Sequence, residues 1–372
     1  MTGPSPLRIR TLRLRDFRNV ASAEWEPHPR FNVLWGDNAQ GKSNVLEAIY
    51  AVGSLRSFRG APPAELVRWG ATDASVEAAV HEGSAEAGTD RSFEISISAQ
   101  TRRLTVRVDS KRPDTASDWF GAIQMVLFHP GSVEVVRGGP EVRRRALDRL
   151  LYQLFPGYAD DHRKYAKALR SRNRLLATGA GDAALDAWEA VMGPLAERIV
   201  TARSAATTPI AAAAVRAHSD LSGAQGTLEI GYRPGVEGHA VVFQSRWAQD
   251  RAADRAAERT RAGPHRDDVE ITLDGKPARA AASQGQQRTI ALALSLAEIS
   301  VLEGLRHRTP ILLLDDVSSE LDPQRNEALF RALTDRGGQV VVTTTRKEYV
   351  RVEAHANQRK DFMISKGHIV LD

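Results

Sequence analysis

The sequence contains no cysteine and no run of about 18 apolar residues, the length that a membrane-spanning helix needs. Without cysteine there are no disulfides, thiolate zinc sites or cysteine nucleophiles, so any bound metal needs oxygen or histidine ligands. Residues 1–10 also lack the apolar segment that follows the basic start of a signal peptide. We therefore expect a soluble, cytoplasmic protein without a membrane anchor.

Charge and composition indicate a globular chain with a mild basic excess. Lys and Arg number 51 against 46 Asp and Glu, which gives a formal net charge of +5 and a pI near 9.6. This excess is compatible with a polyanion partner. A length of 372 residues, 42% of them hydrophobic, predicts two domains or one large domain that carries an insertion.

The order of sequence patterns predicts a mixed α/β protein. The apolar residues 31–35 predict a strand that leads into a glycine-rich loop, and the apolar spacing over residues 43–52 predicts a helix. Alternating patterns over residues 76–108 predict antiparallel strands. Residues 141–218 contain few Gly and Pro and predict an inserted helical lobe, and residues 311–314 predict a buried strand.

The glycine-rich loop has the pattern Gly, four residues, Gly-Lys-Ser. Such a loop turns backbone N–H groups inward as an anion nest at the positive end of a helix. Lys42 would reach the outer phosphates of ATP, and the Ser43 hydroxyl would ligate Mg²⁺. A glycine-rich turn before a core helix is the structural alternative, which the flanking strand and helix disfavour. The predicted nucleotide-binding residues are Gly36, Asp37, Asn38, Ala39, Gln40, Gly41, Lys42 and Ser43.

Two acids end the strand predicted over residues 311–314. Asp315 and Asp316 would lie at the carboxyl edge of a buried strand, where open sheets bind ligands. Asp315 is the candidate Mg²⁺ ligand, and Asp316 is the candidate for orienting or deprotonating the attacking water. A strand that ends in two acids can equally be a turn or a helix cap, but the phosphate loop favours catalysis by Lys42 and Asp316.

Ser283 stands before an amphipathic helix predicted over residues 286–305. Ser283 and Gln286 fit the N-cap and N3 positions of a capping box. A serine and a glycine at a helix start can also bind a phosphate. Both interpretations can hold together.

These motifs resemble those of the RecF family, bacterial recombination-mediator ATPases that are similar to the heads of chromosome-maintenance ATPases and, more distantly, to transporter ATPases. The resemblance covers nearly the whole chain, and several matches in the same order are more specific than any one. The matching segments are residues 14–19, 36–43, 126–151, 263–268, 282–289 and 314–317.

The resemblance implies an α/β fold with an ABC-type P-loop ATPase head. Its sheet would be mixed, with an antiparallel N-terminal β part, and a mostly helical second lobe would be inserted. Residues 1–120 would form the part of the head with the Walker A loop, and residues 121–265 would form the lobe. Residues 266–372 would complete the head with the signature motif, the Walker B strand and the D-loop.

The resemblance also implies a site that a second copy of the chain completes. The signature motif would contact the γ-phosphate of ATP held at Lys42 of another copy, so ATP would bridge a homodimer and hydrolysis would release it. Arg18 and Asn19 would lie near the nucleotide, and His129 would stand where related heads place a magnesium-sensing glutamine. The implied signature residues are Ser283, Gln284, Gly285, Gln286 and Gln287, and the implied D-loop residues are Ser319, Glu320, Leu321 and Asp322.

Two departures from transporter ATPases predict slow hydrolysis that DNA stimulates. Asp316 is one methylene shorter than the glutamate common at that place, and Thr343, Thr344 and Thr345 stand where those enzymes carry a switch histidine. The resemblance further implies gapped DNA and partners of the RecR and RecO kind, which help RecA replace single-strand-binding protein.

Basic residues cluster in the predicted lobe, as a surface that follows DNA phosphates requires. A solvated helical face explains each of them alone. By analogy with related heads, Arg56 and Arg59 are a second candidate contact. Single-stranded, duplex and gapped DNA all stay open, because phosphate contacts do not distinguish them. The cluster comprises Arg143, Arg144, Arg145, Arg149, Arg163, Lys164, Lys167, Arg170, Arg172 and Arg174.

Three rival classes fit fewer of these features. Ser43 and Ser283 lie much farther apart in sequence than the same motifs do in transporter ATPases. About eighty helical residues give a hairpin of only about 60 Å, at about 1.5 Å per residue, which is short for the arm of a chromosome-organising protein. A scaffold that binds ATP without hydrolysing it is the third alternative.

Overall fold

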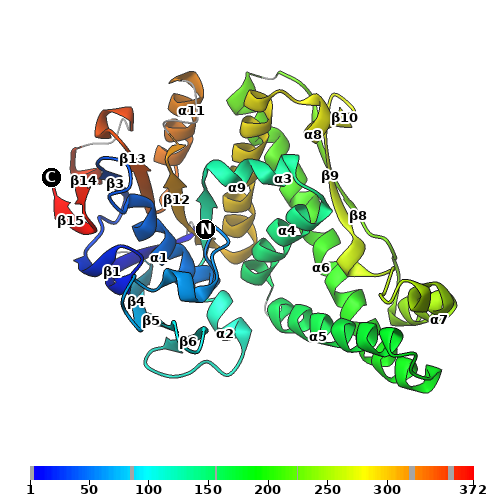
Figure 1. Ribbon diagram of the computed structural model, residues 1–372. Coiled ribbons are helices and arrows are strands. Elements are labelled where there is room, and N and C mark those ends of the chain that lie inside the picture. The colour runs from blue at the N-terminus through cyan, green and yellow to red at the C-terminus, as the bar shows by residue number, and fades with distance from the viewer. Residues whose placement is uncertain (1–3, 84–87, 156, 224, 318–322, 351–355) are drawn as a thin grey trace.

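The computed structural model describes residues 4–83, 88–155, 157–223, 225–317, 323–350 and 356–372. Figure 1 shows the two larger sheets with helix α1 on one side of the molecule and the long helices α5, α6 and α7 on the other, with α9 between them. The molecule therefore has a sheet-rich head and a helical lobe. Within the described residues, no helix combines the length and the apolar character that crossing a membrane requires.

The first sheet is almost entirely antiparallel and confirms the strands predicted over residues 76–108. Its order is β11-β1-β4-β5-β6, and β2 also pairs with β1. A register shift between Ile9 and Thr11 moves the buried positions of β1 from residues 7 and 9 to residues 12 and 14. The strands are β1 (Ser5–Phe17), β2 (Val20–Trp25), β4 (Asp73–Gly83), β5 (Gly88–Ser98), β6 (Arg103–Val108) and β11 (Arg308–Thr309).

The second sheet carries the candidate site and has the order β15-β14-β3-β13-β12-β7. Its strands pair in parallel except for the hairpin of β14 and β15. Both faces are buried, since Leu313 packs with the core around α1 and Leu312 with the core around α9. The strands are β3 (Phe31–Trp35), β7 (Met125–Phe128), β12 (Ile311–Asp315), β13 (Val340–Thr344), β14 (Arg359–Ser365) and β15 (His368–Leu371).

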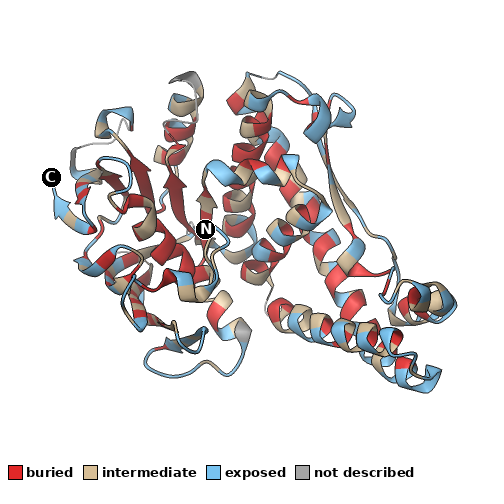
Figure 2. Cartoon of the chain, viewed as in Figure 1, coloured by how far each residue is buried: buried red, intermediate tan, exposed pale blue. Residues whose placement is uncertain are grey.

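Helices cover this sheet and build the lobe, and Figure 2 shows buried residues gathered on the strands and on the inward faces of these helices. A third small sheet, of order β10-β9-β8, lies in the lobe. Its strands are β8 (Leu228–Arg233), β9 (Asp268–Leu273) and β10 (Lys276–Pro277). The helices are α1 (Lys42–Ser54), α2 (Ala116–Phe120), α3 (Glu134–Arg137), α4 (Pro140–Leu154), α5 (Tyr158–Ala177), α6 (Asp182–Ser222), α7 (Ala240–Ala256), α8 (Ala278–Ala281), α9 (Gln284–Arg306) and α11 (Pro323–Thr334).

The lobe does not coincide with the predicted segment, residues 121–265. Strand β7 falls inside that segment but pairs in parallel with β12 in the second sheet of the head. Strand β9 falls beyond residue 265 but pairs with β8 in the lobe. A short run such as residues 125–128 does not reveal from its sequence which sheet it joins, because the pairing partner is distant along the chain.

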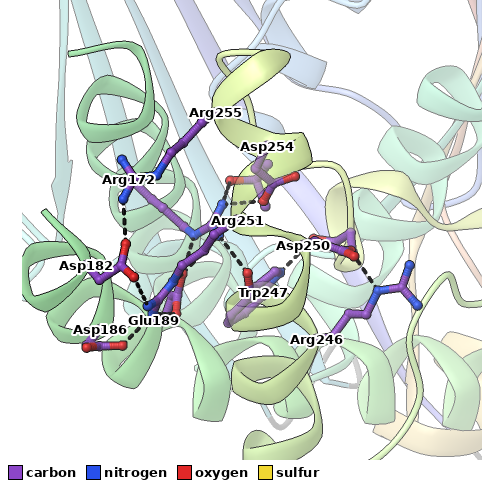
Figure 3. A network of polar contacts seen from close by, with 12 residues as sticks. Arg172, Asp182, Asp186, Glu189, Arg246, Trp247, Asp250, Arg251, Asp254 and Arg255 are labelled. Carbon is purple, nitrogen blue, oxygen red and sulfur yellow. Dashed lines mark hydrogen bonds and ion pairs between the residues drawn. The ribbon is translucent and has the colours of Figure 1, made fainter. Parts of the chain in front are cut away.

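Buried ion pairs fasten the lobe helices α5, α6 and α7 to one another (Figure 3). Arg172 of α5 is fully buried and donates hydrogen bonds to Glu189 of α6 at 3.0 Å and to Asp254 of α7 at 2.8 Å. Arg251 of α7 pairs with Asp186 and Glu189 of α6. These charges compensate each other inside the lobe, so one face of α5 is fixed and the opposite face stays in solvent.

Candidate active site

The loop between β3 and α1 has the backbone that a phosphate nest requires. Gly36 and Gly41 have φ angles of +145° and +112°, and Ala39 has +62°, all in the region that favours glycine. A Cβ atom at Gly36 would lie 2.5 Å from the Ile364 carbonyl oxygen. Helix α1 then begins at Lys42 without a side-chain N-cap and without an acid in its first turn. The Asn44 N–H donates to the Gly41 carbonyl oxygen at 3.0 Å, so an anion would meet the N–H groups that precede it at this helix start.

Lys42 is buried at the mouth of this loop. Its Nζ donates hydrogen bonds of 2.7 Å to the carbonyl oxygens of Gly36 and Asp37. Burial lowers the pKa of Lys42, while the negative charges of Asp316, Asp315 and Asp37 act in the opposite direction. The fold thus brings the predicted lysine of the loop close to both acids predicted at the end of β12.

Asp315 ends β12 and is buried, as the sequence predicts. Thr343 on the neighbouring strand β13 donates from its hydroxyl to Asp315 Oδ1 at 2.7 Å and accepts from the Asp316 N–H at 3.0 Å. Asp316 has a φ of +51°, so the chain turns sharply out of the sheet at this residue. Thr343 therefore orients Asp315 directly and holds the backbone of Asp316. The register of β12 and β13 places Asp315 opposite Thr343, which no single-strand pattern reveals.

Donor chemistry at this edge fits a hard cation. The Asp315 carboxylate and the Ser43 hydroxyl are oxygen ligands of the kind Mg²⁺ takes together with phosphate and water. No group of three or more His, Asp or Glu that could hold a metal occurs among the described residues. A metal here would thus depend on phosphate oxygens for the rest of its coordination, as in other nucleotide sites.

His129 follows β7 at the same edge of the sheet. Its Nδ1 accepts a hydrogen bond of 3.2 Å from the Gly131 N–H, and its ring lies 5.1 Å from that of Phe58. Burial lowers the pKa of His129 to about 4, against the opposing charge of Asp315. His129 is therefore neutral near pH 7, with its proton on Nε2. Its proximity to Asp315 is compatible with the sensing role that the resemblance implies.

Arg18 and Asn19 lie in the turn between β1 and β2, next to the loop. Arg18 pairs with the fully buried Glu47 of α1 through two hydrogen bonds of 2.9 and 2.8 Å. Asn19 donates to the Gln40 carbonyl oxygen at 3.1 Å and accepts from Asn44 at 2.8 Å. Asn19 thus contacts the loop itself, whereas the guanidinium of Arg18 is engaged by an acid of α1.

Ser283 caps α9 in the capping box that the sequence predicts. Its Oγ accepts from the Gln286 N–H at 3.3 Å, and Gln286 Oε1 accepts from the Ser283 N–H at 2.8 Å. Ser283 and Gln284 are exposed, while Gln287 is buried and accepts a hydrogen bond of 2.6 Å from Arg137. Figure 1 shows α8 and the start of α9 beside α3 and apart from α1. The predicted D-loop residues Ser319, Glu320, Leu321 and Asp322 lie outside the described residues.

The arginines predicted to contact DNA occupy different environments. Arg143 is buried and binds both oxygens of Asp268 at 2.8 and 2.9 Å, so it does not fit the expected phosphate contact. Arg144 is half-buried and donates to the Asp267 carbonyl oxygen. Arg145 remains exposed and pairs with Glu141 on its own helix. The sequence cannot separate these cases, because the acid partners of Arg143 and Arg144 lie on the distant segment around β9.

Arg56 and Arg59, the second candidate DNA contact, are both exposed near the end of α1. Arg59 donates to Asn44 at 2.8 Å and lies 3.5 Å from Glu47, so it belongs to the same polar cluster as Arg18. Arg56 and Arg149 instead line a cleft of about 610 Å³ between the head and the lobe. The prediction for Arg56 and Arg59 stays a prediction.

Together these features define an ABC-type ATPase head. They are a parallel sheet with a phosphate loop, an acid at the carboxyl edge of that sheet, and an inserted lobe with a serine-capped helix. The RecF/RecN/SMC N terminal domain matches residues 8–365 of the chain. The DNA replication and repair protein RecF of Myxococcus xanthus is 38% identical over 93% of this chain and 92% of that protein. RecF of Geobacter sulfurreducens is 35% identical over 98% of this chain and 99% of that protein.

A solved structure of the recombination mediator protein RecF with ATP, of the RecFOR pathway, superposes with a TM-score of 0.89. The two sequences are 29% identical, and the superposition covers 99% of this chain and 100% of the RecF chain in that structure. The chain belongs to the RecF family of ATPases.

Proposed function

We propose that the chain is an ATP-dependent DNA-binding protein of recombinational repair and replication restart, in which ATP joins two copies on DNA. The observation that carries this proposal is the placement of the phosphate loop and of the serine-capped start of α9 on separate parts of one chain. The loop with Lys42 begins α1 in the head, and the exposed Ser283 begins α9 beside α3 and α8. A second copy would supply the helix start that the loop lacks.

The residues at the sheet edge have complementary roles in hydrolysis. Lys42 would exchange the carbonyl oxygens of Gly36 and Asp37 for the outer phosphates of ATP. Ser43 and Asp315 would hold Mg²⁺, which when bound offsets phosphate charge. Asp316 would orient the attacking water, and Thr343 keeps both acids in place. The short Asp316 carboxylate and the absence of a histidine at residues 343–345 support slow turnover, which DNA would stimulate by favouring the dimer.

DNA would follow the exposed face of α5. Arg163, Lys167, Arg170 and Arg174 recur at helical spacing, are exposed and face away from the buried Arg172. No acid occurs in the sequence from residue 162 to the end of this helix. Charge reversal by Arg170→Glu should lower the salt dependence of DNA binding by about one unit of slope. Arg216→Glu, at an exposed arginine of α6, is the matched control and should leave the slope unchanged.

Partners of the RecR and RecO kind would act on the DNA-bound dimer and help load recombinase at single-stranded gaps. The pathway named for the RecF structure similar to this chain supports this part of the proposal.

Sedimentation of the full chain with Mg²⁺ and ATP, ADP or no nucleotide tests the dimer. We expect dimers with ATP alone. Ser283→Asp keeps a good N-cap but sets a carboxylate against the γ-phosphate, so it should abolish dimerisation and leave ATP binding intact. Ser283→Asn, of the same shape without the charge, should dimerise. Dimers that form equally with ADP would refute the proposal. If the dimers of Asp316→Asn do not last longer than those of wild type, the scaffold that binds ATP without hydrolysing it would be favoured.

A further inference from the structure

Trp69 is the outlier among the tryptophans of this chain. The residue is 98% exposed, whereas Trp25, Trp119 and Trp247 are buried. Trp is the largest side chain and loses much by staying in water, since burying apolar surface contributes about 25 cal/mol per Å². A tryptophan that packs against nothing in its own chain is therefore available to a binding partner.

The turn that carries Trp69 is firmly attached to the head. The Arg68 N–H donates to the Asp16 carbonyl oxygen at 2.7 Å, and the Arg18 N–H donates to the Leu66 carbonyl oxygen at 2.8 Å. The Arg68 side chain also pairs with Asp16 at 2.6 Å. Gly70, with a φ of +86°, then turns the chain away in open space. The indole is thus held out from a fixed base, which limits the entropy lost when it binds.

The surroundings of Trp69 fit a nucleobase better than a protein partner. Tryptophans that anchor protein interfaces lie inside well-packed apolar patches. The other exposed large apolar side chains of the described residues lie on α6, α7 and α9 and beyond α11, and none of them is in this turn. Basic residues flank it instead: Arg15, on the hairpin to which the turn is bonded, is exposed, and Arg68 in the turn is paired with Asp16. A lone aromatic ring among cations is the arrangement that stacks on bases beside a phosphate chain.

We infer that Trp69 stacks on an unpaired or terminal base of bound DNA. This inference rests on the proposed function, because it requires that the chain binds DNA. In a continuous duplex each base is covered on both faces, so Trp69 gains nothing there without unstacking a step. At a single strand or at the junction of a gap, base faces are free. Trp69 therefore gives the chain a means to prefer gaps that phosphate contacts alone cannot provide.

The hairpin beneath Trp69 also touches the nucleotide loop. Asp16 binds the Trp69 turn, and Asn19 of the same hairpin donates to the Gln40 carbonyl oxygen at 3.1 Å. DNA held at Trp69 would lie beside the face that meets the second copy. We therefore expect ATP to strengthen the contribution of Trp69, because two copies present two tryptophans to one DNA molecule.

The test compares wild type, Trp69→Ala and Trp69→Phe with ATP and Mg²⁺ by fluorescence anisotropy. The probes are a labelled single strand, a gapped duplex and a continuous duplex closed into a circle so that it has no terminal base, each titrated at several salt concentrations. Trp69→Ala should weaken binding to the single strand and the gapped duplex about tenfold and leave the continuous duplex unchanged. The salt slope should stay the same, since stacking releases no counterions. Trp69→Phe should retain most of the affinity.

The melting temperature of Trp69→Ala should equal that of wild type, because the exposed indole contributes little packing. Equal affinity of Trp69→Ala and wild type for all three DNAs would overturn the inference and leave a protein partner as the use of this residue. A loss of the same size on all three DNAs would also overturn it. If wild type itself binds none of the DNAs, the proposed function fails instead.

Discussion

Arg137 donates a hydrogen bond of 2.6 Å from its Nε to Oε1 of Gln287. Arg137 ends α3, eight residues after His129 at the edge of the ATPase sheet. Gln287 lies in the first turn of α9, and its amide donates to the Ala282 carbonyl oxygen at 3.1 Å, directly before the cap Ser283. This contact joins the segment that follows His129 to the helix start predicted to contact the γ-phosphate of another copy.

Arg137→Ala should therefore impair the signature motif of its own chain, at the start of α9, and leave the phosphate loop of that chain unchanged. We expect ATP binding to be unchanged and ATP turnover to fall about tenfold, as the loss of one charged hydrogen bond of about 1.5–3 kcal/mol allows. Mixing with Lys42→Ala should restore turnover, because both defects then share one site. Mixing with Ser283→Asp should not. Restoration by Ser283→Asp instead would show that Arg137 acts on its own nucleotide.

Thr343 should control the affinity for Mg²⁺ without touching the metal. Thr343→Val keeps the shape of the side chain but removes the hydroxyl that binds Asp315 and the Asp316 N–H. Removing such a supporting hydrogen bond costs about 10- to 100-fold in metal affinity. When ATP turnover is titrated with Mg²⁺, the Mg²⁺ concentration that gives half-maximal turnover should rise by this factor for Thr343→Val. It should change little for Thr343→Ser. An unchanged Mg²⁺ dependence of Thr343→Val would refute this role.

Arg172 should matter for stability and not for DNA. Arg172→Met leaves Asp254 buried without its ion-pair partner and Glu189 paired with Arg251 alone, which costs about 3–5 kcal/mol. Arg174→Met, two residues on and exposed, should change the free energy of unfolding by less than about 0.5 kcal/mol. Urea unfolding measures both values. Equal stability of the two variants would contradict the buried network of Figure 3.

His265 should make the lobe sensitive to acid. Its Nδ1 lies 2.9 Å from the Tyr165 hydroxyl and its Nε2 3.0 Å from the Thr260 carbonyl oxygen, and burial lowers the pKa of His265 to about 4. The unfolded chain binds a proton near pH 6.5, so stability from neutral His265 is complete above that pH and is lost as the pH falls toward 4.

This histidine can change the free energy of unfolding by at most about 1.4 kcal/mol per pH unit. His265→Asn should reduce the loss of stability between pH 6.5 and 4, as measured by urea unfolding at each pH. The control His368→Asn, at an exposed histidine of β15, should keep the wild-type slope. If His265→Asn also keeps that slope, burial of the neutral imidazole ring does not cause the loss of stability in acid.

The sequence predicted those parts of the fold and candidate site that depend on neighbours along the chain. The glycines of the loop, the acids after β12 and the capping box at Ser283 are short patterns, and the structure places each as expected. Arg143 and Arg172 look in sequence like the exposed Arg170, because only their distant acid partners distinguish them. The roles proposed for Thr343 and Trp69 could not be predicted for the same reason, since strand register and exposure are tertiary properties.

The most direct test of a site shared between two copies is the ATP turnover of Lys42→Ala mixed with Ser283→Asp. Each variant alone should be inactive, because Lys42→Ala lacks the lysine at every site and Ser283→Asp does not dimerise with ATP. In a mixed dimer both defects fall in one site and the other site is intact, so an equal mixture should recover up to about half of wild-type turnover. An equal mixture that stays as inactive as the two variants alone would contradict the account.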